Sequence, residues 1–498
     1  MEKTKHTDSY SHILKYAGIF GGVQGLSILV GILRNKLVAT LLGPDGMGLI
    51  SLFTSSLSLV SNSTNLGLSV SGIRNLSNAY ETNDQPTLNR LILVLRSWTL
   101  LAALLGVFVC FVLAPWLNDF TFTWGDHTLH FMLLSPIVGL MAITACETTI
   151  LKATRQLKRL AALSLLNVFL SLFISVPLFY FFRAAAIIPS MFILSLLQML
   201  LIIIYSFRLY PIHIFMRKGV LGEGLQMVQL GVFFVLAGIM GSGADFLIRS
   251  YLNTEASLTD VGLYNAGYMM MMTCASTVFA SLESDYFPRL SAISSHQFTM
   301  NQTINRQVEI TFLFLVPILI TFVITLPILI PLLYTDKFLP VLGMMQIMVF
   351  EMYIRSVRLP IEYIPLAKGD SKSFLFLETV YFSVLALLVI QGFKAYGLMG
   401  AGIGMVVAGI FDLILVLVYA RWRYHYRFSM NAGRYVLMFS PLCCAAFALS
   451  FIHTPWLYWP FGGAVSIISL SLSIFILRKK TNVWQSLTDK IKRKISHS

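Results

Sequence analysis

A stripe of charged residues inside an apolar stretch is the first chemical feature of the sequence. Its members are spaced by four, three and four residues and are Glu351, Arg355, Arg358 and Glu362. This spacing puts them on one face of a helix and allows two i,i+4 ion pairs. The stripe can be purely structural, with its acids and bases neutralising each other in ion pairs along the helix. Alternatively, Arg355 and Arg358 are shared with an anionic ligand, because guanidinium groups match phosphate oxygens; we favour this second reading for Arg358.

Other ionisable residues occur singly in or near apolar runs, where charge is costly and usually faces a cavity or a partner. Lys15, Arg34 and Arg96 are the cations. Lys15 and Arg34 can contribute to a diphosphate site or extend to the lipid head groups. Asp245 and Arg249 are four residues apart and most simply pair with each other. Candidate groups for a coupling ion are Asp245, Glu351, Glu147 and Asp412, and Glu378 is a further isolated acid.

Small polar residues form a second pattern, at steps of three or four, and comprise Ser51, Ser55, Ser58, Asn62, Asn65 and Ser69. They share one helical face, where hydroxyls and amides can hydrogen-bond sugars or simply allow close helix packing. The candidate sugar contacts are Ser55, Ser58, Asn62, Asn65 and Gln24.

Motifs for covalent or nucleotide chemistry were not found. The sequence has no nucleophile and base arrangement, no Walker lysine motif and no metal-ligand spacing. All five cysteines fall inside apolar runs, as packing residues do. We therefore expect a transporter rather than an enzyme, without a cofactor or a metal.

The elements that must position these residues are membrane helices. Hydrophobic residues make up 57% of the chain and charged residues 12%, and apolar runs of about 20 residues, each long enough to cross a bilayer as a helix, recur throughout. The fold class is therefore all-α integral membrane, with about fourteen transmembrane helices. They are predicted near residues 12–34, 46–70, 89–114, 129–151, 160–182, 186–207, 222–247, 260–282, 307–333, 340–366, 373–392, 397–420, 434–452 and 457–477.

The net charge of +14 does not indicate nucleic-acid binding, because the basic residues sort by side of the membrane. Most fall in segments that are cytoplasmic if the N-terminus is inside; the opposite loops hold only Arg34, Lys36, Arg183, Arg249, Lys337 and Lys394. This positive-inside pattern puts both termini in the cytoplasm and requires an even number of crossings.

Two halves of the chain match weakly at an offset of about 214 residues. The segment 46–49 recurs at 260–263, and the loop 153–158 matches 367–372. With about six helices in each copy, the repeat is parallel, and two like-oriented bundles predict alternating access. The predicted parts are an N-lobe (1–215), a C-lobe (216–430), two further C-terminal helices (431–478) and a basic amphipathic cytoplasmic tail (479–498) that contacts membrane lipids.

Several short segments, in this order along the chain, carry a family resemblance. They are residues 37–48 (LVATLLGPDGMG), 65–68 (NLGL), 260–264 (DVGLY), 287–291 (FPRLS), 336–338 (DKF) and 367–369 (AKG). Together with the helix count and the repeat, they resemble the polysaccharide branch of the multidrug/oligosaccharidyl-lipid/polysaccharide (MOP) exporter superfamily, specifically the Wzx-type O-antigen translocases.

This resemblance implies a flippase of the bacterial cytoplasmic (inner) membrane, in polysaccharide and lipopolysaccharide biosynthesis. It would move undecaprenyl-diphosphate-linked oligosaccharide to the outer leaflet, coupled to an ion gradient. It also implies partners, a polysaccharide polymerase and a chain-length regulator. Arg358, Arg355, Lys15 and Arg34 are then the candidates for binding the diphosphate.

Two other functions compete with a flippase. A cation-coupled multidrug exporter of the same superfamily would need unpaired acids in its cavity, whereas helix 12–34 carries Lys15 and Arg34 and no acid. A membrane glycosyltransferase or polymerase would need a sizeable extramembrane loop, and it would leave the repeat unexplained.

Overall fold

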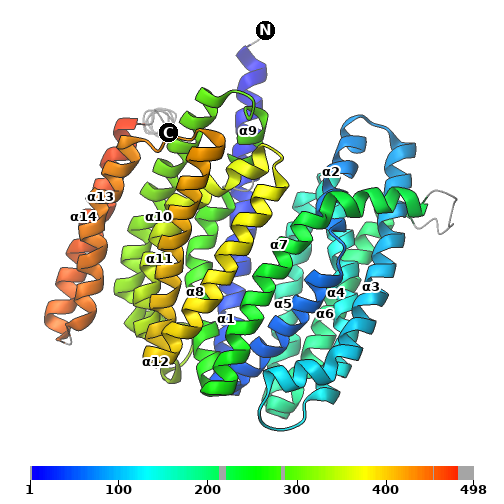
Figure 1. Cartoon of the computed structure of the whole chain (residues 1–498), viewed down its shortest axis with the longest axis horizontal. Helices are drawn as coiled ribbons and strands as arrows, with labels where there is room; N and C mark the ends of the chain where they lie inside the picture. The colour runs from blue at the N-terminus through cyan, green and yellow to red at the C-terminus, as the bar shows by residue number, and fades with distance from the viewer. Residues whose placement is uncertain (1–2, 212–219, 282–285, 453, 481–498) are drawn as a thin grey trace, which may run out of the picture. The chain divides into compact units, whose positions relative to one another are not determined.

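The computed structural model describes residues 3–211, 220–281, 286–452 and 454–480. Side chains are described from 26 to 478 within those ranges, except at 221, 230, 277, 280 and 281. All elements in this part are helical, which confirms the predicted all-α membrane fold (Figure 1). The helices of the first half are α1 (Lys3–Thr64), α2 (Leu68–Glu81), α3 (Gln85–Thr121), α4 (Thr128–Ala153), α5 (Leu157–Phe182), the short 3₁₀ helix η1 (Arg183–Ala186), α6 (Ile187–Leu209) and α7 (Val220–Glu255).

The second half begins with α8 (Leu258–Ser281), whose first residues pack with the first half. It continues with α9 (Phe287–Ala292), α10 (Gln297–Leu333), the 3₁₀ helix η3 (Asp336–Val341), α11 (Leu342–Ala367), α12 (Ser371–Tyr424), α13 (Met430–Ala448), η4 (Leu449–Phe451) and α14 (Pro455–Lys480). Each predicted span falls largely on one of these helices. The predicted tail lies almost wholly outside the described residues.

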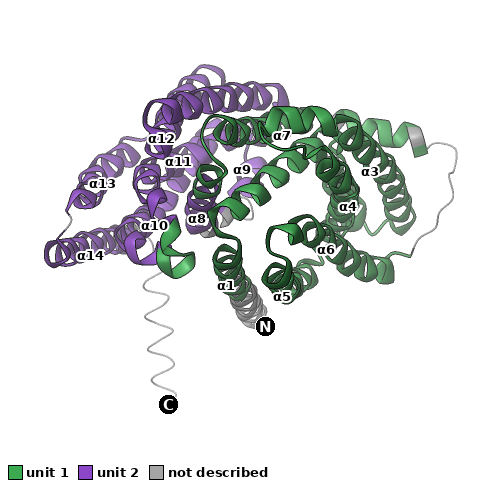
Figure 2. Ribbon diagram, turned by 90° about the horizontal axis from the view of Figure 1, so that it is seen from below, with its two compact units in different colours: residues 1–263, 331–337 green, residues 264–330, 338–498 purple. Residues whose placement is uncertain are grey.

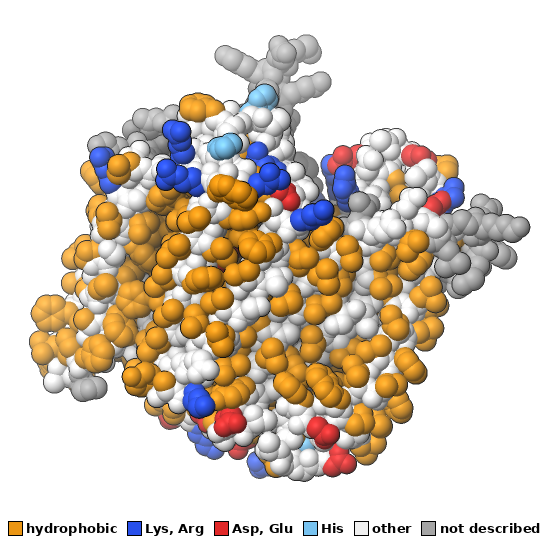
Figure 3. All heavy atoms as spheres, in the orientation of Figure 1, with side chains coloured by type: hydrophobic (Ala, Val, Ile, Leu, Met, Phe, Trp, Pro, Cys, Tyr) orange, Lys and Arg blue, Asp and Glu red, His pale blue; other side chains and the backbone are white. Residues whose placement is uncertain are grey.

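Ten helical stretches among the described residues are long and apolar enough to cross a membrane. Three of them, Leu26–Thr64, Leu157–Leu209 and Ser371–Tyr424, are 39, 53 and 54 residues long. Each is longer than the roughly 25 residues that one crossing uses. On the face shown in Figure 3, hydrophobic side chains cover the middle of each unit and charged side chains gather at the ends. The chain is thus a multi-pass membrane protein.

Local chemistry explains the breaks within and between helices. Inside α1, Gly43 has a φ of 69°, which favours glycine, and is followed by Pro44. The first two predicted helices therefore form one kinked helix rather than two helices with a loop. Within α12, non-helical angles at Tyr396 and Gly397 mark the boundary between predicted spans 373–392 and 397–420. The side chain of Asp84 accepts a hydrogen bond from Thr87 N and so caps α3.

The chain packs as two compact units (Figure 2). Unit 1 comprises residues 1–263 with 331–337, and unit 2 comprises 264–330 with 338–498. In unit 1, α4 packs along both α3 and α6, and α7 packs on α1, α2 and α3, so α7 belongs to the compact unit formed by the N-terminal helices. The lobe boundary predicted near residue 215 remains a prediction about the repeat.

Unit 2 is built around α10, α11 and α12. Its core includes Phe312, Ile361 and Phe439, from α10, α11 and α13. The hydroxyl of Tyr458 on α14 donates to the carbonyl of Ile324 on α10 at 2.8 Å. The two helices expected outside the repeat therefore share the core of this unit.

The predicted offset reappears in backbone geometry. Arg155, after α4, has a φ of 57°, and Gly369, after α11, has a φ of 71°; they are 214 residues apart (369 − 155). Their N–H groups donate to the carbonyls of Lys152 and Leu366, 3.1 Å in both cases, and these acceptors have the same offset (366 − 152). A second pair with positive φ, Arg183 and Gly397, is also 214 residues apart (397 − 183). The two halves thus repeat the same turns.

Candidate functional site

The charged stripe lies on α11 inside unit 2, and its centre is Arg358, whose side chain is only 2% exposed. Helix α11 begins after η3 and ends at Ala367, so residues 351–362 fall in its middle. A guanidinium at this depth must be paired or hydrogen-bonded, because an isolated charge in an apolar interior is very costly.

Three carboxyl groups surround the Arg358 guanidinium. Its Nε lies 2.9 Å from Glu362 Oε1, which confirms one of the predicted i,i+4 pairs. Its Nη1 lies 2.7 Å from Asp412 Oδ2 on α12, and its Nη2 lies 3.7 Å from Glu351 Oε1. The guanidinium also stacks 4.5 Å from the ring centroid of Tyr381 on α12. Asp412, which looked isolated in the sequence, is therefore a counterion of Arg358.

Arg355 has different surroundings, although it lies less than one turn away. Its guanidinium sits 5.6 Å from the ring centroid of Phe279, and its Nη1 lies 3.7 Å from the sulfur of Met272, both on α8. Within the described residues it forms no ion pair, because Glu351 pairs with Arg358 instead of forming the second predicted i,i+4 pair. Arg355 is therefore the arginine of the stripe that has no ion pair in the described part of the chain.

Acids outnumber bases in this cluster. Glu378 joins Glu362, Asp412 and Tyr381 around a small cavity of about 10 Å³, roughly the space of one water molecule. With Glu351 there are four carboxyl groups, and Arg358 is the guanidinium that pairs with three of them, so the carboxyls outnumber the positive charge that they share. Nowhere among the described residues do three or more His, Cys, Asp or Glu side chains converge as metal ligands. Buried acids without a counterion are neutralised by binding protons, so the cluster is suited to holding protons.

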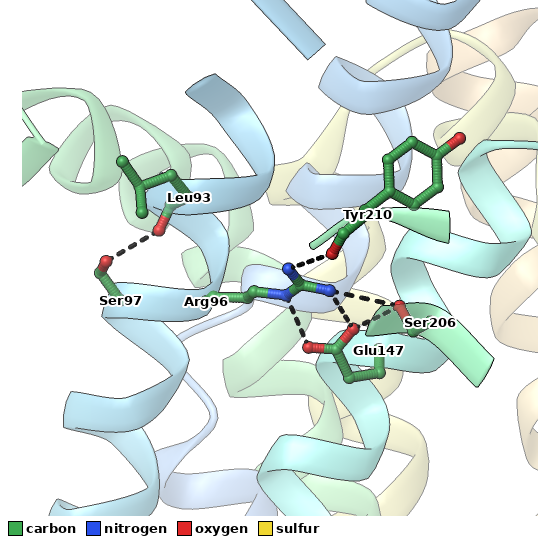
Figure 4. Close-up of polar contacts among 6 residues, drawn as sticks. All are labelled: Leu93, Arg96, Ser97, Glu147, Ser206 and Tyr210. Atoms are coloured by element: carbon green, nitrogen blue, oxygen red, sulfur yellow. Dashed lines mark hydrogen bonds and ion pairs between the residues drawn. The ribbon is translucent and has the colours of Figure 1, made fainter. Parts of the chain in front are cut away.

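Unit 1 contains a separate ion pair between Arg96 on α3 and Glu147 on α4 (Figure 4). Arg96 Nε and Nη2 donate to the two carboxylate oxygens of Glu147 at 2.8 and 2.9 Å. Ser206 on α6 donates to the same carboxylate at 2.5 Å, and Arg96 Nη1 donates to the carbonyl of Tyr210 at 2.9 Å. The side chains of Arg96 and Glu147 are only 14% and 3% exposed. This bidentate pair ties three helices together.

The remaining predicted ionisable residues have partners of their own. Arg249 and Asp245 form the predicted i,i+4 ion pair, and Arg249 Nε also donates to Ser51 Oγ at 2.7 Å. Arg34, half-buried on α1, donates from Nε to Ser175 Oγ on α5 at 3.1 Å. Lys15 lies among the residues whose side chains are outside the described part.

The polar face of residues 51–69 serves partly for packing. Ser55 is buried and donates to the carbonyl of Leu52 at 2.9 Å. Ser58, Asn62 and Asn65 are half-buried, and Asn65 Oδ1 accepts from the N–H of Gly67 at 2.8 Å. Their proposed contact with sugar remains a prediction. Gln24, like Lys15, has no described side chain.

Outside the spans, Asp370 lies in the turn before α12 and accepts several hydrogen bonds. Its carboxylate accepts from Ser373 N at 3.2 Å and from Ser373 Oγ at 2.8 Å, and it accepts from the Tyr424 hydroxyl at 3.0 Å. Burial acts to raise the pKa of Asp370, but these hydrogen bonds and the nearby Arg423 lower it overall.

Several partners were missed by sequence reasoning because they lie on different helices. Arg96 and Glu147 are 51 residues apart, and Arg358 and Asp412 are 54 apart (412 − 358). For Arg96 and Glu147, the available signal was one lone base and one lone acid on consecutive apolar helices. Charge balance favours their pairing, but sequence alone does not set the helix rotation that allows it.

Comparison with known proteins identifies relatives at the level of family and fold. A family model described as polysaccharide biosynthesis protein matches residues 37–342. The solved structure titled "Lipid II flippase MurJ, inward closed conformation" is 13% identical, with a TM-score of 0.71, over 93% of this chain and 99% of that chain. No curated protein sequence matches the chain.

Multidrug transporters are also similar in fold. An inward-facing MATE family transporter of the MOP superfamily is 12% identical, with a TM-score of 0.64, over 80% of this chain and 94% of that one. A Vibrio cholerae MATE transporter, VcmN, is 12% identical, with a TM-score of 0.60, over 82% and 99%. These likenesses establish the MOP fold.

Proposed function

Because the chain belongs to the polysaccharide biosynthesis protein family, we propose that it is a flippase for undecaprenyl-diphosphate-linked oligosaccharide, such as an O-antigen repeat unit. It would carry this lipid from the inner to the outer leaflet of the bacterial cytoplasmic membrane by alternating access, as a non-enzymatic step of lipopolysaccharide biosynthesis. The observation that carries the proposal is Arg355, a guanidinium at membrane depth that forms no ion pair in the described part of the chain. The likeness in fold to a lipid II flippase supports a lipid-linked cargo.

Arg355 is the group best placed to bind the diphosphate, because it forms no ion pair with an acid among the described residues. Arg34 is a second candidate, since its observed partner is a neutral hydroxyl. Arg358 can bind phosphate only by sharing its guanidinium with Glu362 and Asp412. Lys15 remains a candidate from the sequence, as do Ser55, Ser58, Asn62, Asn65 and Gln24 for the sugar.

The surplus of acids around Arg358 suggests how transport is coupled. When a diphosphate draws on the charge of Arg358, Glu351 and Asp412 lose part of their compensation, and each is then more stable with a proton bound. Release of the cargo on the other side would restore the ion pairs and release the protons there, so protons would travel in the same direction as the cargo. Asp245 and Glu147 are less suited to coupling, because Arg249 and Arg96 pair with them directly.

A liposome assay tests the proposal. Fluorescent undecaprenyl-diphosphate oligosaccharide is placed in vesicles, and its exposure to an impermeant quencher is followed for wild type, Arg355→Ala and Arg355→Lys. We expect wild type to speed exchange, Arg355→Ala to lose about tenfold or more, equivalent to about 1.4 kcal/mol, and Arg355→Lys to keep part of the rate. Arg90→Ala is the control, because Arg90 lies on α3 with its side chain 62% exposed. Equal rates for wild type and Arg355→Ala would exclude this role for Arg355.

A cation-coupled multidrug exporter is the alternative, and the surplus of buried and half-buried acids in unit 2 is the observation that favours it. A cationic drug would be attracted by the carboxyls of Glu378 or Asp412. The same vesicles test this alternative. If they leave the lipid in place and move an organic cation such as ethidium in response to an imposed ion gradient, the multidrug exporter replaces the flippase proposal.

A further inference from the structure

A large cavity lies within unit 1, apart from the charged cluster of unit 2. It has a volume of about 490 Å³ and is formed by α3, α4 and α6. Its apolar lining includes Leu93, Leu100, Ile143, Ile203 and Phe207. Because α3 and α6 both pack along α4, α4 forms the floor of a groove and the other two helices form its walls.

The groove is about as long as one leaflet of a membrane is thick. Its lining on α3 extends from Gln85 to Leu100, a rise of about 22 Å at about 1.5 Å per residue. This is close to half of the roughly 40–45 Å thickness of a whole bilayer. Gln85 and Asn89 are exposed and polar, whereas Leu100 is exposed and apolar, so the groove has one end suited to water and one suited to hydrocarbon.

The polar section of the groove has a free hydrogen-bond donor but no net charge. A guanidinium has five N–H groups, and the described contacts of Arg96 use four of them, on Glu147 twice, Ser206 and Tyr210 (Figure 4). One N–H of Nη1 remains, and the amide of Asn89 lines the same cavity. Glu147 neutralises the charge of Arg96, so a neutral or singly charged head group fits better here than a diphosphate.

We propose that this groove binds one phospholipid of the bilayer, in the leaflet that faces the predicted cytoplasmic side. An acyl chain would lie against Leu100, Ile143 and Ile203, because an apolar surface open to a bilayer is most readily covered by hydrocarbon. The phosphate or ester oxygens would accept hydrogen bonds from Arg96 and Asn89. The proposed lipid is a structural ligand rather than the transported cargo, and the inference is independent of the proposed function.

Native mass spectrometry of the full-length protein in detergent tests the site, with dioleoyl phosphatidylethanolamine as the probe. The test variant combines Ile143→Trp and Ile203→Trp, which fill the groove from α4 and α6. The control is Leu200→Trp, which adds the same bulk on α6 at an exposed position outside the groove lining. We expect wild type and the control to retain one lipid, and the double variant to bind about tenfold more weakly. Equal retention by all three proteins, or none by wild type, would overturn the proposal.

A second variant tests the head-group contact without altering the apolar groove. Asn89 is exposed, so Asn89→Leu should leave the thermal unfolding midpoint of the lipid-free protein unchanged while weakening retention of the lipid several-fold. Competition then distinguishes the source of the ligand. If undecaprenyl phosphate displaces the phospholipid one for one at a lower concentration, the groove belongs to the transported lipid and the structural role is wrong. A failure of flipping in the liposome assay would not affect this result.

Discussion

Arg96 and Arg358 are both buried guanidiniums in membrane helices, yet their surroundings differ in charge. Arg96 faces one carboxylate, that of Glu147, whereas Arg358 faces those of Glu351, Glu362 and Asp412. A one-to-one pair is electrostatically complete and can act as a fixed structural link. A cluster with excess acid changes its proton count when its surroundings change. Substitutions in the Arg96–Glu147 pair are therefore expected to change stability, and substitutions in the Arg358 cluster are expected to change transport.

For the Arg96–Glu147 pair, we expect Arg96→Ala to lower the free energy of unfolding by about 3 kcal/mol, because it leaves a buried carboxylate without its partner. The double variant Arg96→Leu with Glu147→Leu should recover most of this loss. Chemical unfolding in detergent measures both. Arg90→Ala removes an exposed pair with Glu223 and should change stability by less than about 1 kcal/mol. A double variant as unstable as the single one would mean that the pair is not the source of the effect.

For the acid cluster, Asp412→Asn should make the rate of flipping insensitive to a proton gradient. Asparagine keeps an oxygen near Arg358 but cannot exchange a proton at physiological pH. One proton moved down a gradient of one pH unit supplies about 1.4 kcal/mol, or about tenfold in rate or accumulation. In liposomes, wild-type flipping should respond to an imposed gradient by up to this factor, while Asp412→Asn should give the same rate with and without it. A variant that still responds fully would rule out Asp412 as the coupling group.

At the scale of the helix, caps and close approaches determine where the elements lie. Asp370 caps α12 in the turn that repeats the geometry of the α4–α5 turn. Gly48 of α1 lies against the start of α8, where a side chain at its position would reach the backbone nitrogen of Gly262 at 3.1 Å and overlap the carbonyl oxygen of Leu258. Gly48 and Gly262 are also 214 residues apart (262 − 48), so the repeated motif is used for a backbone contact within unit 1.

Removing the cap with Asp370→Ala should lower the free energy of unfolding by about 1 kcal/mol at pH 7. Because the pKa of Asp370 is lowered from 3.8 in the folded protein, its charge stabilises the fold fully above about pH 4 to 5, and this contribution is lost as the pH falls through the folded pKa. The difference between wild type and Asp370→Ala should thus shrink in acid. Asp370→Asn, which keeps a cap oxygen, should remain close to wild type at neutral pH. A difference that stays constant with pH would indicate a purely steric effect.

Gly48→Ala should destabilise unit 1, because the added methyl group must displace the backbone of Leu258. The expected cost is about 1–3 kcal/mol, typical of overpacking. Gly31→Ala is the matched control on the same helix, since nothing lies within 4 Å of the added atom. Thermal unfolding in detergent compares the two. If both variants unfold alike, the close approach of α1 and α8 contributes little.

At the scale of the whole molecule, the repeat duplicates backbone turns but not charge. Positions 155 and 369 share their conformation. In contrast, the residues 214 positions after Arg96 and Glu147 are Ile310 and Ile361. The halves have thus kept the same architecture while their ionisable groups differ. This difference agrees with a structural ion pair in one lobe and, in the other lobe, a cluster whose charge changes when protons bind.

Membrane orientation supplies a prediction for the entire chain. With both termini in the cytoplasm, a green fluorescent protein fused after Ser498 should fluoresce, because it folds poorly after export to the periplasm. Alkaline phosphatase fused after Ala185, in a predicted outer loop, should be active, and it should be inactive when fused after Arg155. Activity in the opposite pattern would reverse the assigned sidedness.

The sequence by itself determined that the chain is a membrane protein, that it is helical and that its repeat has an offset of about 214 residues. Apolar run length and hydrogen bonding within each helix are local properties, so they can be read without knowing the tertiary structure. The i,i+4 pairs Arg358–Glu362 and Asp245–Arg249 were predictable for the same reason, because both members lie on one helix.

Only the tertiary structure decided which charges meet across helices. Three features depend on the rotation and depth of neighbouring helices: the pairing of Glu147 with Arg96, the approach of Asp412 to Arg358, and the lack of an ion partner for Arg355 within the described residues. Side-chain packing over many residues sets these quantities, and no short pattern encodes them. The sequence therefore identified the charged residues of the candidate site, whereas the fold determined which of them are neutralised and which remain available to a ligand.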